Sequence, residues 1–203
     1  MILKEIFDKI VSFIVLIVLL PIFLIVAFLI KIDSKGPVFF LQERVGKGEK
    51  IFKAIKFRTM FTEALQKTRG IYINKDNPYV TRVGKFLRRS GIDELPQLIN
   101  VLKGEMSLVG PRPTLEYQVE KYDDFQRKRL LMKPGITGWA LVNGRNKLTW
   151  PERIKLDVWY VEHWSFWLDI KILFKTVWMV AKGEGLYADV TTDEIVKVDD
   201  KNE

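Results

Sequence analysis

The pattern of apolar and polar residues divides the chain into one long uncharged stretch and a series of shorter mixed segments. Residues 10–30 form 21 consecutive positions without a charged side chain. A helix of that length extends for about 30 Å, which matches the hydrocarbon core of a bilayer. The stretch therefore predicts a helix that enters a membrane.

Pro21 lies at the middle of this stretch, where it removes a backbone hydrogen bond and kinks the helix. Two geometries follow: a kinked helix that spans the bilayer, or a helix-break-helix that enters and leaves by the same face. Length and hydrophobicity alone favour a span. The flanking Lys9 and Lys31 give little orientation bias, and both can reach headgroups if the two ends share one interface.

Shorter patterns follow the apolar stretch. Two runs rich in β-forming residues, 38–41 and 51–57, are separated by a segment of glycine and lysine and predict a β-hairpin. In residues 81–89, basic side chains recur at helical spacing beside apolar ones. This pattern indicates a basic amphipathic helix on a membrane or along a phosphate cleft. Residues 62–78 are polar and indicate a helix followed by a loop.

The last third of the chain is rich in aromatic residues. Pro151 suits the first turn of a helix, so we expect a helix over residues 151–163. Residues 169–182 are apolar but contain two lysines, and we expect them to lie on a membrane or on the domain. Amphipathic rings prefer the headgroup zone, and five are candidates for it: Trp159, Tyr160, Trp164, Trp167 and Trp178. Trp139, Trp150 and His163 are expected to pack or cap, and residues 189–203 to fray.

Composition narrows the chemistry. The 203 residues carry a net charge of +8, which favours an anionic partner such as phospholipid or nucleotide. The absence of cysteine excludes disulfides, thiolate catalysis and cysteine-bound zinc. One histidine, His163, cannot build a multi-histidine site. A metal would therefore be a hard ion held by carboxylates, Mg²⁺ or Mn²⁺.

The segment 90–113 combines these charges in a pattern typical of phosphate chemistry. Asp93 and Glu94 are adjacent, and because Pro96 is tolerated only in a first turn, we expect a helix from Asp93 to about Lys103. Gly104 would end it. Carboxylates can hold a divalent cation or attack phosphorus, and cations can neutralise phosphate oxygens. Four cations lie upstream: Arg82, Lys85, Arg88 and Arg89.

Further cations are candidates for phosphate or nucleotide binding. Arg112 stands between Pro111 and Pro113, which restrict its backbone. Lys56 and Arg58 share one strand face by the two-residue period. Arg145 follows a glycine in a partly extended stretch. Arg88 and Arg112 are the first candidates for a forked contact to phosphate.

The assembled motifs resemble the monotopic bacterial sugar transferase family, the phosphoglycosyl transferases. The resemblance extends over nearly the whole chain, and its compact length is similar to the small PglC-type members. The motifs lie at residues 33–40, 42–46, 56–60, 80–84, 93–97, 104–113, 134–138 and 142–145.

The resemblance implies a helix-rich α+β fold with a re-entrant membrane helix that breaks at Pro21. It implies three parts: a membrane-inserted segment over 1–33, a cytoplasmic catalytic domain over 34–190 and a flexible acidic tail over 191–203. The expected location is the cytoplasmic face of the bacterial inner membrane, in contact with phospholipids. The expected partners are a UDP-sugar donor, undecaprenyl phosphate and Mg²⁺, held by Glu94 and Asp93, with Asp93 as the nucleophile and UMP as the product.

Alternatives remain at this stage. Small members imply N,N′-diacetylbacillosamine as the sugar, whereas galactose, glucose or N-acetylgalactosamine fit the same chemistry. A non-enzymatic basic adaptor on the membrane would use the same anchor and charge, but it leaves Asp93, Glu94 and the Gly110–Pro113 segment without a role. Nucleic acid is not expected, because exposed stacking aromatics are not interleaved with the basic residues. A homodimer is an open alternative for the apolar C-terminal helix.

Overall fold

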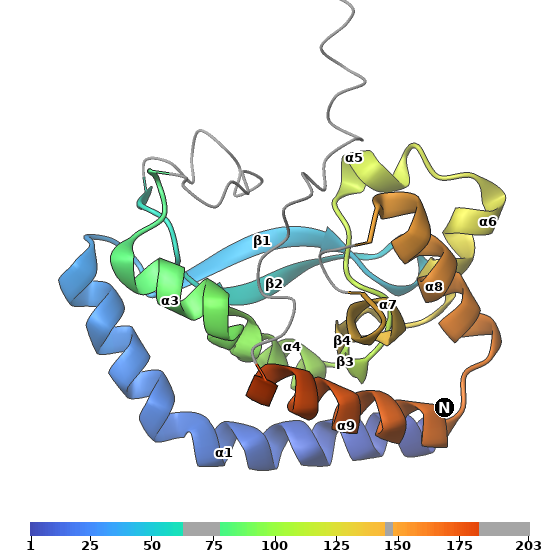
Figure 1. The fold of residues 1–203 in the computed structure, drawn as a ribbon, viewed down its shortest axis with the longest axis horizontal. Helices are drawn as coiled ribbons and strands as arrows, with labels where there is room; N and C mark the ends of the chain where they lie inside the picture. Colours follow the sequence, from blue (N-terminus) through green and yellow to red (C-terminus); the bar gives the residue numbers. More distant parts are fainter. Residues whose placement is uncertain (63–77, 145–147, 183–203) are drawn as a thin grey trace, which may run out of the picture. The chain divides into compact units, whose positions relative to one another are not determined.

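The computed structural model describes residues 1–62, 78–144 and 148–182, which form two compact units of a helix-rich α+β fold (Figure 1). The first unit comprises Met1–Glu43 and Lys53–Leu108. The second comprises Arg44–Phe52 and the chain from Val109 onward. Three sequence predictions fall outside the described residues. They concern most of the polar segment 62–78, Arg145 and the acidic tail. The expected three-part division therefore stays a prediction.

The first unit contains the apolar stretch as part of one long helix, α1 (Ile2–Asp33). Its other helical elements are α3 (Arg82–Ser90), the 3₁₀ helix η2 (Ile92–Gln97) and α4 (Leu98–Lys103). The predicted hairpin is confirmed: β1 (Phe39–Val45) pairs with β2 (Ile51–Phe57) through the 3₁₀ turn η1 (Lys47–Glu49). Gly48 in this turn has a φ of 62°, which a residue without Cβ adopts at no steric cost.

In the first half of helix α1, the pattern of buried and exposed side chains is the reverse of that in a helix of a soluble protein. In its first half the buried side chains are polar, namely Lys4, Asp8 and Ser12, whose four-residue spacing places them on one face. The apolar side chains around them are exposed: Ile2, Leu3, Ile6, Ile10, Phe13, Ile14, Ile17 and Val18. Among the described residues, α1 is also the one helix that is long and apolar enough to cross a membrane.

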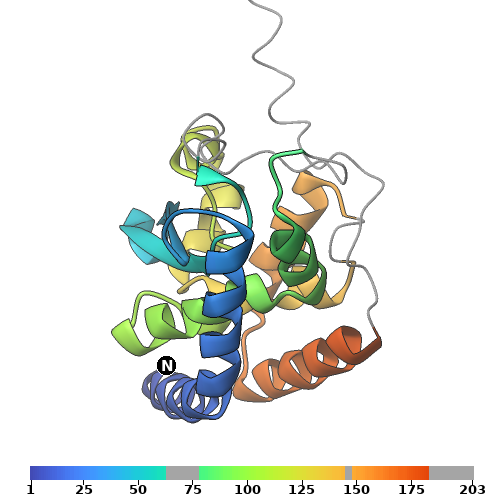
Figure 2. The ribbon, with the colours of Figure 1, turned by 90° about the vertical axis from the view of Figure 1, so that its left-hand side faces the viewer.

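The two halves of α1 run in different directions. Figure 1 shows a bend between them, and Figure 2 shows the first half nearly end on while the second half runs upward in the plane of the view. Pro21 is the proline inside this helix. Because Pro21 cannot donate a backbone hydrogen bond and its ring crowds the preceding turn, it accounts for the bend.

The second half of α1 returns to apolar packing. Val26 and Ile30 belong to a buried cluster with Phe57 of β2 and Leu87 of α3. Phe23 packs edge-on against Phe57, with ring centroids 5.1 Å apart. This cluster fixes α3 and the end of β2 against the carboxyl-terminal half of α1.

The second unit is built from short helices around a separate core. Val109, the last residue of β3 (Ser107–Val109), begins this unit, and the next residues are hydrogen-bonded to β4 (Gly135–Thr137). Val45, Tyr122 and Val158 lie in the core cluster, and Trp150 packs against it, as expected. The helical elements are α5 (Glu116–Val119), α6 (Asp124–Arg127), η3 (Lys128–Leu131), α7 (Trp139–Val142), α8 (Trp150–Glu162) and α9 (Phe166–Lys182).

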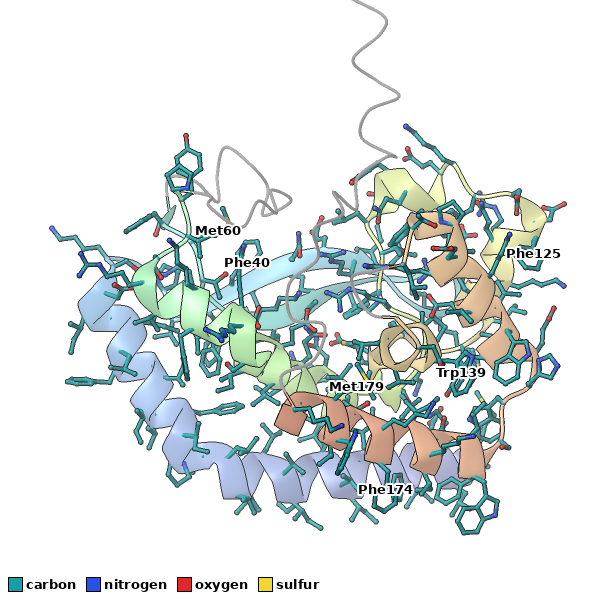
Figure 3. All side chains as sticks on the ribbon, viewed as in Figure 1. Phe40, Met60, Phe125, Trp139, Phe174 and Met179 are labelled. Carbon is teal, nitrogen blue, oxygen red and sulfur yellow. The ribbon has the colours of Figure 1, made fainter. Side chains whose placement is uncertain are left out.

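The aromatic residues of α8 and α9 separate into two groups. Trp167 and Trp178 are 79% and 62% exposed, like Phe174, which is labelled on α9 in Figure 3. Tyr160, by contrast, is fully buried, and its hydroxyl donates to Asp169 at 2.6 Å. Its assignment to the headgroup zone is therefore wrong, because this hydrogen bond draws the ring into the core.

Trp164 is also held by Asp169, through its indole nitrogen at 3.0 Å. His163 ends α8 and stacks on Trp159 with ring centroids 4.6 Å apart, so the prediction that it caps or packs is confirmed. Trp159 in turn stacks on Trp139.

Candidate active site

Asp93 and Glu94 lie in the first turn of η2, directly before α4. The predicted end of the helix at Lys103 and Gly104 is confirmed, but its predicted start is wrong. Gly91 adopts a left-handed conformation with a φ of 72°, and a 3₁₀ turn begins at Ile92 before the α-helix starts at Leu98. Asp93 is therefore within the turn and does not cap it. Both carboxylate residues are half-buried.

Glu94 forms an ion pair with Lys56 from β2. The Lys56 Nζ donates to Glu94 Oε1 at 2.8 Å, and the two side chains are 17% and 21% exposed. Partial burial strengthens such a pair relative to one on an open surface. Lys56, predicted as a phosphate ligand, thus contacts the catalytic candidate Glu94 directly.

Arg88 of α3 lies close enough to Asp93 for their charges to interact. Burial lowers the pKa of Arg88 from its ordinary value, and the negative charge of Asp93 acts in the opposite direction. The guanidinium still carries its charge at neutral pH. Its Nε donates to the hydroxyl of Thr59 at 2.9 Å. The first unit therefore brings two carboxylates and two cations together: Asp93, Glu94, Arg88 and Lys56.

The position of α3 is determined at its amino-terminal end. Thr81 caps the helix by accepting from the backbone of Gly84, and Asp33 at the end of α1 accepts from the backbone of Val83 at 2.9 Å. A Cβ on Gly84 would lie 2.0 Å from the carbonyl oxygen of Thr59, so only glycine permits this close approach. The helix that carries Arg88 is thus fixed against the segment after β2.

Arg58 occupies a different place from Lys56. Its side chain is 1% exposed, and it donates to the carbonyl oxygens of Ser34 and Lys35, just after α1. A third contact runs to the hydroxyl of Thr62 at 3.0 Å. Arg58 therefore holds the segment that follows α1, and its predicted contact with phosphate stays a prediction.

Pro111 and Arg112 belong to the second unit. Arg112 is exposed, and its carbonyl oxygen accepts from Arg129 at 2.9 Å. Arg129 also donates to the hydroxyl of Tyr122 at 2.7 Å and pairs with Asp157. Arg44 donates to the carbonyl of Pro113 at 3.2 Å. The segment is thus held at its backbone, whereas the expected approach of Arg112 to Asp93 stays a prediction.

For three of these residues, Thr59, Arg129 and Asp157, the sequence gives no indication of the contacts that they make. Thr59 is part of a recognised motif, at residues 56–60, but a threonine there has no charge to attract notice. Arg129 and Asp157 are 28 positions apart and lie in segments that resemble solvated helices. Their pairing depends on the packing of η3 against α8, which spacing alone does not reveal.

Asp93 and Glu94 are also the residues that could hold a metal. Mg²⁺ in phosphate-transferring sites is bound by one or two carboxylates, and substrate phosphates and water complete its shell. Within residues 1–62, 78–144 and 148–182 there is no cluster of three or more aspartate, glutamate or histidine side chains. The donor set fits an ion that the substrate helps to bind.

The chain matches a known family along most of its length. The family model described as bacterial sugar transferase matches residues 1–183. An uncharacterized sugar transferase, EpsL, of Bacillus subtilis is 45% identical over 92% of this chain and 91% of its own length. An undecaprenyl-phosphate galactose phosphotransferase of Salmonella typhimurium is 39% identical over 91% of this chain but 42% of its own length.

An undecaprenyl-phosphate glucose phosphotransferase of Komagataeibacter xylinus is 43% identical over 86% of this chain and 35% of its own length. The chain thus spans less than half of these two longer relatives and nearly all of EpsL. The motifs at residues 56–60, 80–84 and 93–97, from which the resemblance was inferred, all lie within the matched range. The family match and the extent of these similarities agree, and the chain belongs to the bacterial sugar transferase family.

Proposed function

We propose that this protein transfers a sugar 1-phosphate from a UDP-sugar to undecaprenyl phosphate and releases UMP. The observation that carries the proposal is the grouping of Asp93, Glu94, Arg88 and Lys56 in one unit with the apolar helix α1. The relatives from Salmonella typhimurium and Komagataeibacter xylinus are named for transfer to the same lipid phosphate.

The transfer takes place in two steps. A carboxylate oxygen of Asp93 attacks the β-phosphorus of the donor, and the bond from that phosphorus to the bridging oxygen breaks as UMP leaves with the electron pair. An oxygen of undecaprenyl phosphate then attacks the same phosphorus and releases the carboxylate. Two steps through a covalent intermediate allow a soluble donor and a lipid acceptor to visit the site in turn.

Asp93 suits the role of nucleophile because a carboxylate is ionised at neutral pH and needs no base to activate it. Arg88, whose charge interacts with that of Asp93, would bind the phosphate oxygens with forked donors. Such cations stabilise the charge that develops on the transferring group. Arg112 and Arg145 are second candidates for the nucleotide or the lipid phosphate.

Glu94 would hold Mg²⁺ together with Asp93, and the ion would supply positive charge to the phosphate oxygens. Lys56 keeps the Glu94 carboxylate in place through their 2.8 Å contact.

The helix α1 would enter and leave the membrane by one face. Asp8, near its beginning, accepts from Ser107 at 2.6 Å, and Asp33, at its end, accepts from Val83 at 2.9 Å. Both partners belong to the first unit, so both ends of α1 are tied to the same body. Nucleotide sugars are made in the cytoplasm, so we expect that body to lie at the cytoplasmic face of the inner membrane.

Galactose and glucose are the first candidates for the sugar, because the two relatives are named as galactose and glucose phosphotransferases. N,N′-diacetylbacillosamine, expected from chain length, is the alternative. The experiment is release of UMP from a panel of UDP-sugars, with undecaprenyl phosphate and Mg²⁺ present. We expect one donor to be preferred and Asp93→Asn to be inactive with it. Lack of UMP release from every donor would overturn the proposal.

A further inference from the structure

Thr59 stands at a junction between the hairpin and α3. It follows β2 by two residues and is 7% exposed. Its hydroxyl accepts the hydrogen bond from Arg88 Nε at 2.9 Å. A hydrogen bond to a charged donor is stronger than one between neutral groups, and this contact restricts the direction in which the Arg88 guanidinium points.

The backbone of Thr59 is held from both sides. Its carbonyl oxygen accepts from Thr81 at 3.1 Å, and the amide of the preceding Arg58 donates to Val38 at 2.9 Å. The missing side chain of Gly84 lets α3 approach that carbonyl. The hydroxyl is therefore presented from a rigid support, as a group that positions another group must be.

We propose that Thr59 is a positioning residue, which orients the Arg88 guanidinium beside Asp93 for the phosphate group in transfer. The inference rests on the proposed function. Thr59 acts through Arg88 and is not itself a catalytic residue. Because an arginine side chain has many rotamers, loss of the hydroxyl frees the guanidinium to leave its place, and the phosphate oxygens lose an aligned partner.

Thr59→Val is the direct test, since valine has nearly the same shape and lacks the hydroxyl. We expect kcat/KM for the UDP-sugar to fall about tenfold or more, mainly through kcat. Thr59→Ser keeps the hydroxyl and should recover most of the activity. Ser90→Ala is the control. It removes a hydroxyl from α3, the helix that carries Arg88, where the group donates to the carbonyls of Phe86 and Leu87, and it should change kcat/KM little.

A double-mutant cycle separates positioning from general support of the fold. In an Arg88→Ala background, Thr59→Val should cause no further loss, because its target is gone. An equal loss in both backgrounds would overturn the inference, as would wild-type kcat/KM in Thr59→Val. Thr59→Ala serves as a second variant if the valine protein does not fold.

The same assay keeps the two proposals apart. Asp93→Asn is measured in parallel with the same UDP-sugar and undecaprenyl phosphate. If the wild-type protein releases no UMP from any donor, the proposed function fails, and if Asp93→Asn turns over normally, the role of Asp93 as nucleophile fails. If Asp93→Asn is inactive but Thr59→Val is normal, the inference about Thr59 fails alone.

Discussion

At the scale of single residues, the contact between Lys56 and Glu94 yields a direct prediction. Lys56→Met removes the charge but keeps most of the length of the side chain, and the half-buried Glu94 loses its 2.8 Å contact with Lys56. We expect kcat/KM to fall about tenfold, since an ion pair of this kind contributes on the order of 1–2 kcal/mol. UMP release under saturating lipid measures the effect.

Lys53→Met is the matched control. Lys53 lies on the same strand and is exposed, so its loss should leave kcat/KM nearly unchanged. Equal activity of the two variants would show that the pair with Glu94 has no part in the reaction.

Which residues the sequence reveals depends on how local their signal is. Asp93, Glu94 and Arg88 are close in sequence and carry charge, so their grouping could be predicted. The role of Thr59 could not be predicted, because it depends on a single hydrogen bond with Arg88, 29 positions away. Arg58 has the right charge, but whether it faces phosphate or the end of α1 depends on packing that the two-residue strand period does not determine.

At the scale of elements, the contact between α3 and the segment after β2 predicts an effect of Gly84→Ala. The new methyl group would lie 2.0 Å from the Thr59 carbonyl oxygen, so α3 must move. We expect a loss of about 1–3 kcal/mol in the free energy of unfolding, with lower activity. A thermal melt checks it. Gly48→Asn, with open space and a left-handed backbone, should melt like the wild type.

Helix α8 gives a prediction of pH dependence. Hydrogen bonds from Thr149 at the helix start lower the pKa of Glu152 below its ordinary value. A lowered pKa means stability that is present above the ordinary pKa and lost as pH falls through the lowered one. Glu152→Gln should therefore make the melting temperature of this unit fall less steeply below about pH 4.5. Parallel melting curves for the two proteins would contradict this assignment.

Element boundaries were predictable where a residue enforces them. Gly104 ends α4 as expected, since it takes the left-handed conformation that ends helices. The start of the same helix was not, because the 3₁₀ turn at Ile92 depends on Gly91 joining α3 to η2. Tyr160 was misplaced for a related reason: its burial depends on Asp169 in the next helix.

At the scale of the whole molecule, the course of α1 is the main prediction. The chain has no cysteine, so Ile2→Cys and Lys35→Cys each introduce a unique site for a thiol-specific label. A re-entrant helix places both on one side of the membrane. An impermeant maleimide should therefore label both positions in inverted inner-membrane vesicles and neither in right-side-out vesicles. Labelling from opposite sides would establish a span and contradict the re-entrant geometry.

The apolar stretch and its break at Pro21 could be recognised in the sequence. Hydrophobicity alone favoured a span, and the expectation of a return came from the family resemblance. The proposed return is supported by two contacts, from Asp8 to Ser107 and from Asp33 to Val83, each between distant parts of the chain. The polar face formed by Lys4, Asp8 and Ser12 is three residues within a charge-poor helix, and its burial emerges only in the folded unit.

The central claim is that the Asp93 carboxylate bonds to phosphorus during transfer. The most direct measurement is peptide mass spectrometry of the full chain in vesicles, after exposure to its UDP-sugar without undecaprenyl phosphate. We expect a sugar phosphate on the peptide that contains Asp93, removed when the lipid phosphate is added, and none on Asp93→Asn. Turnover by Asp93→Asn at the wild-type rate, or a sugar phosphate attached to another residue, would contradict the account.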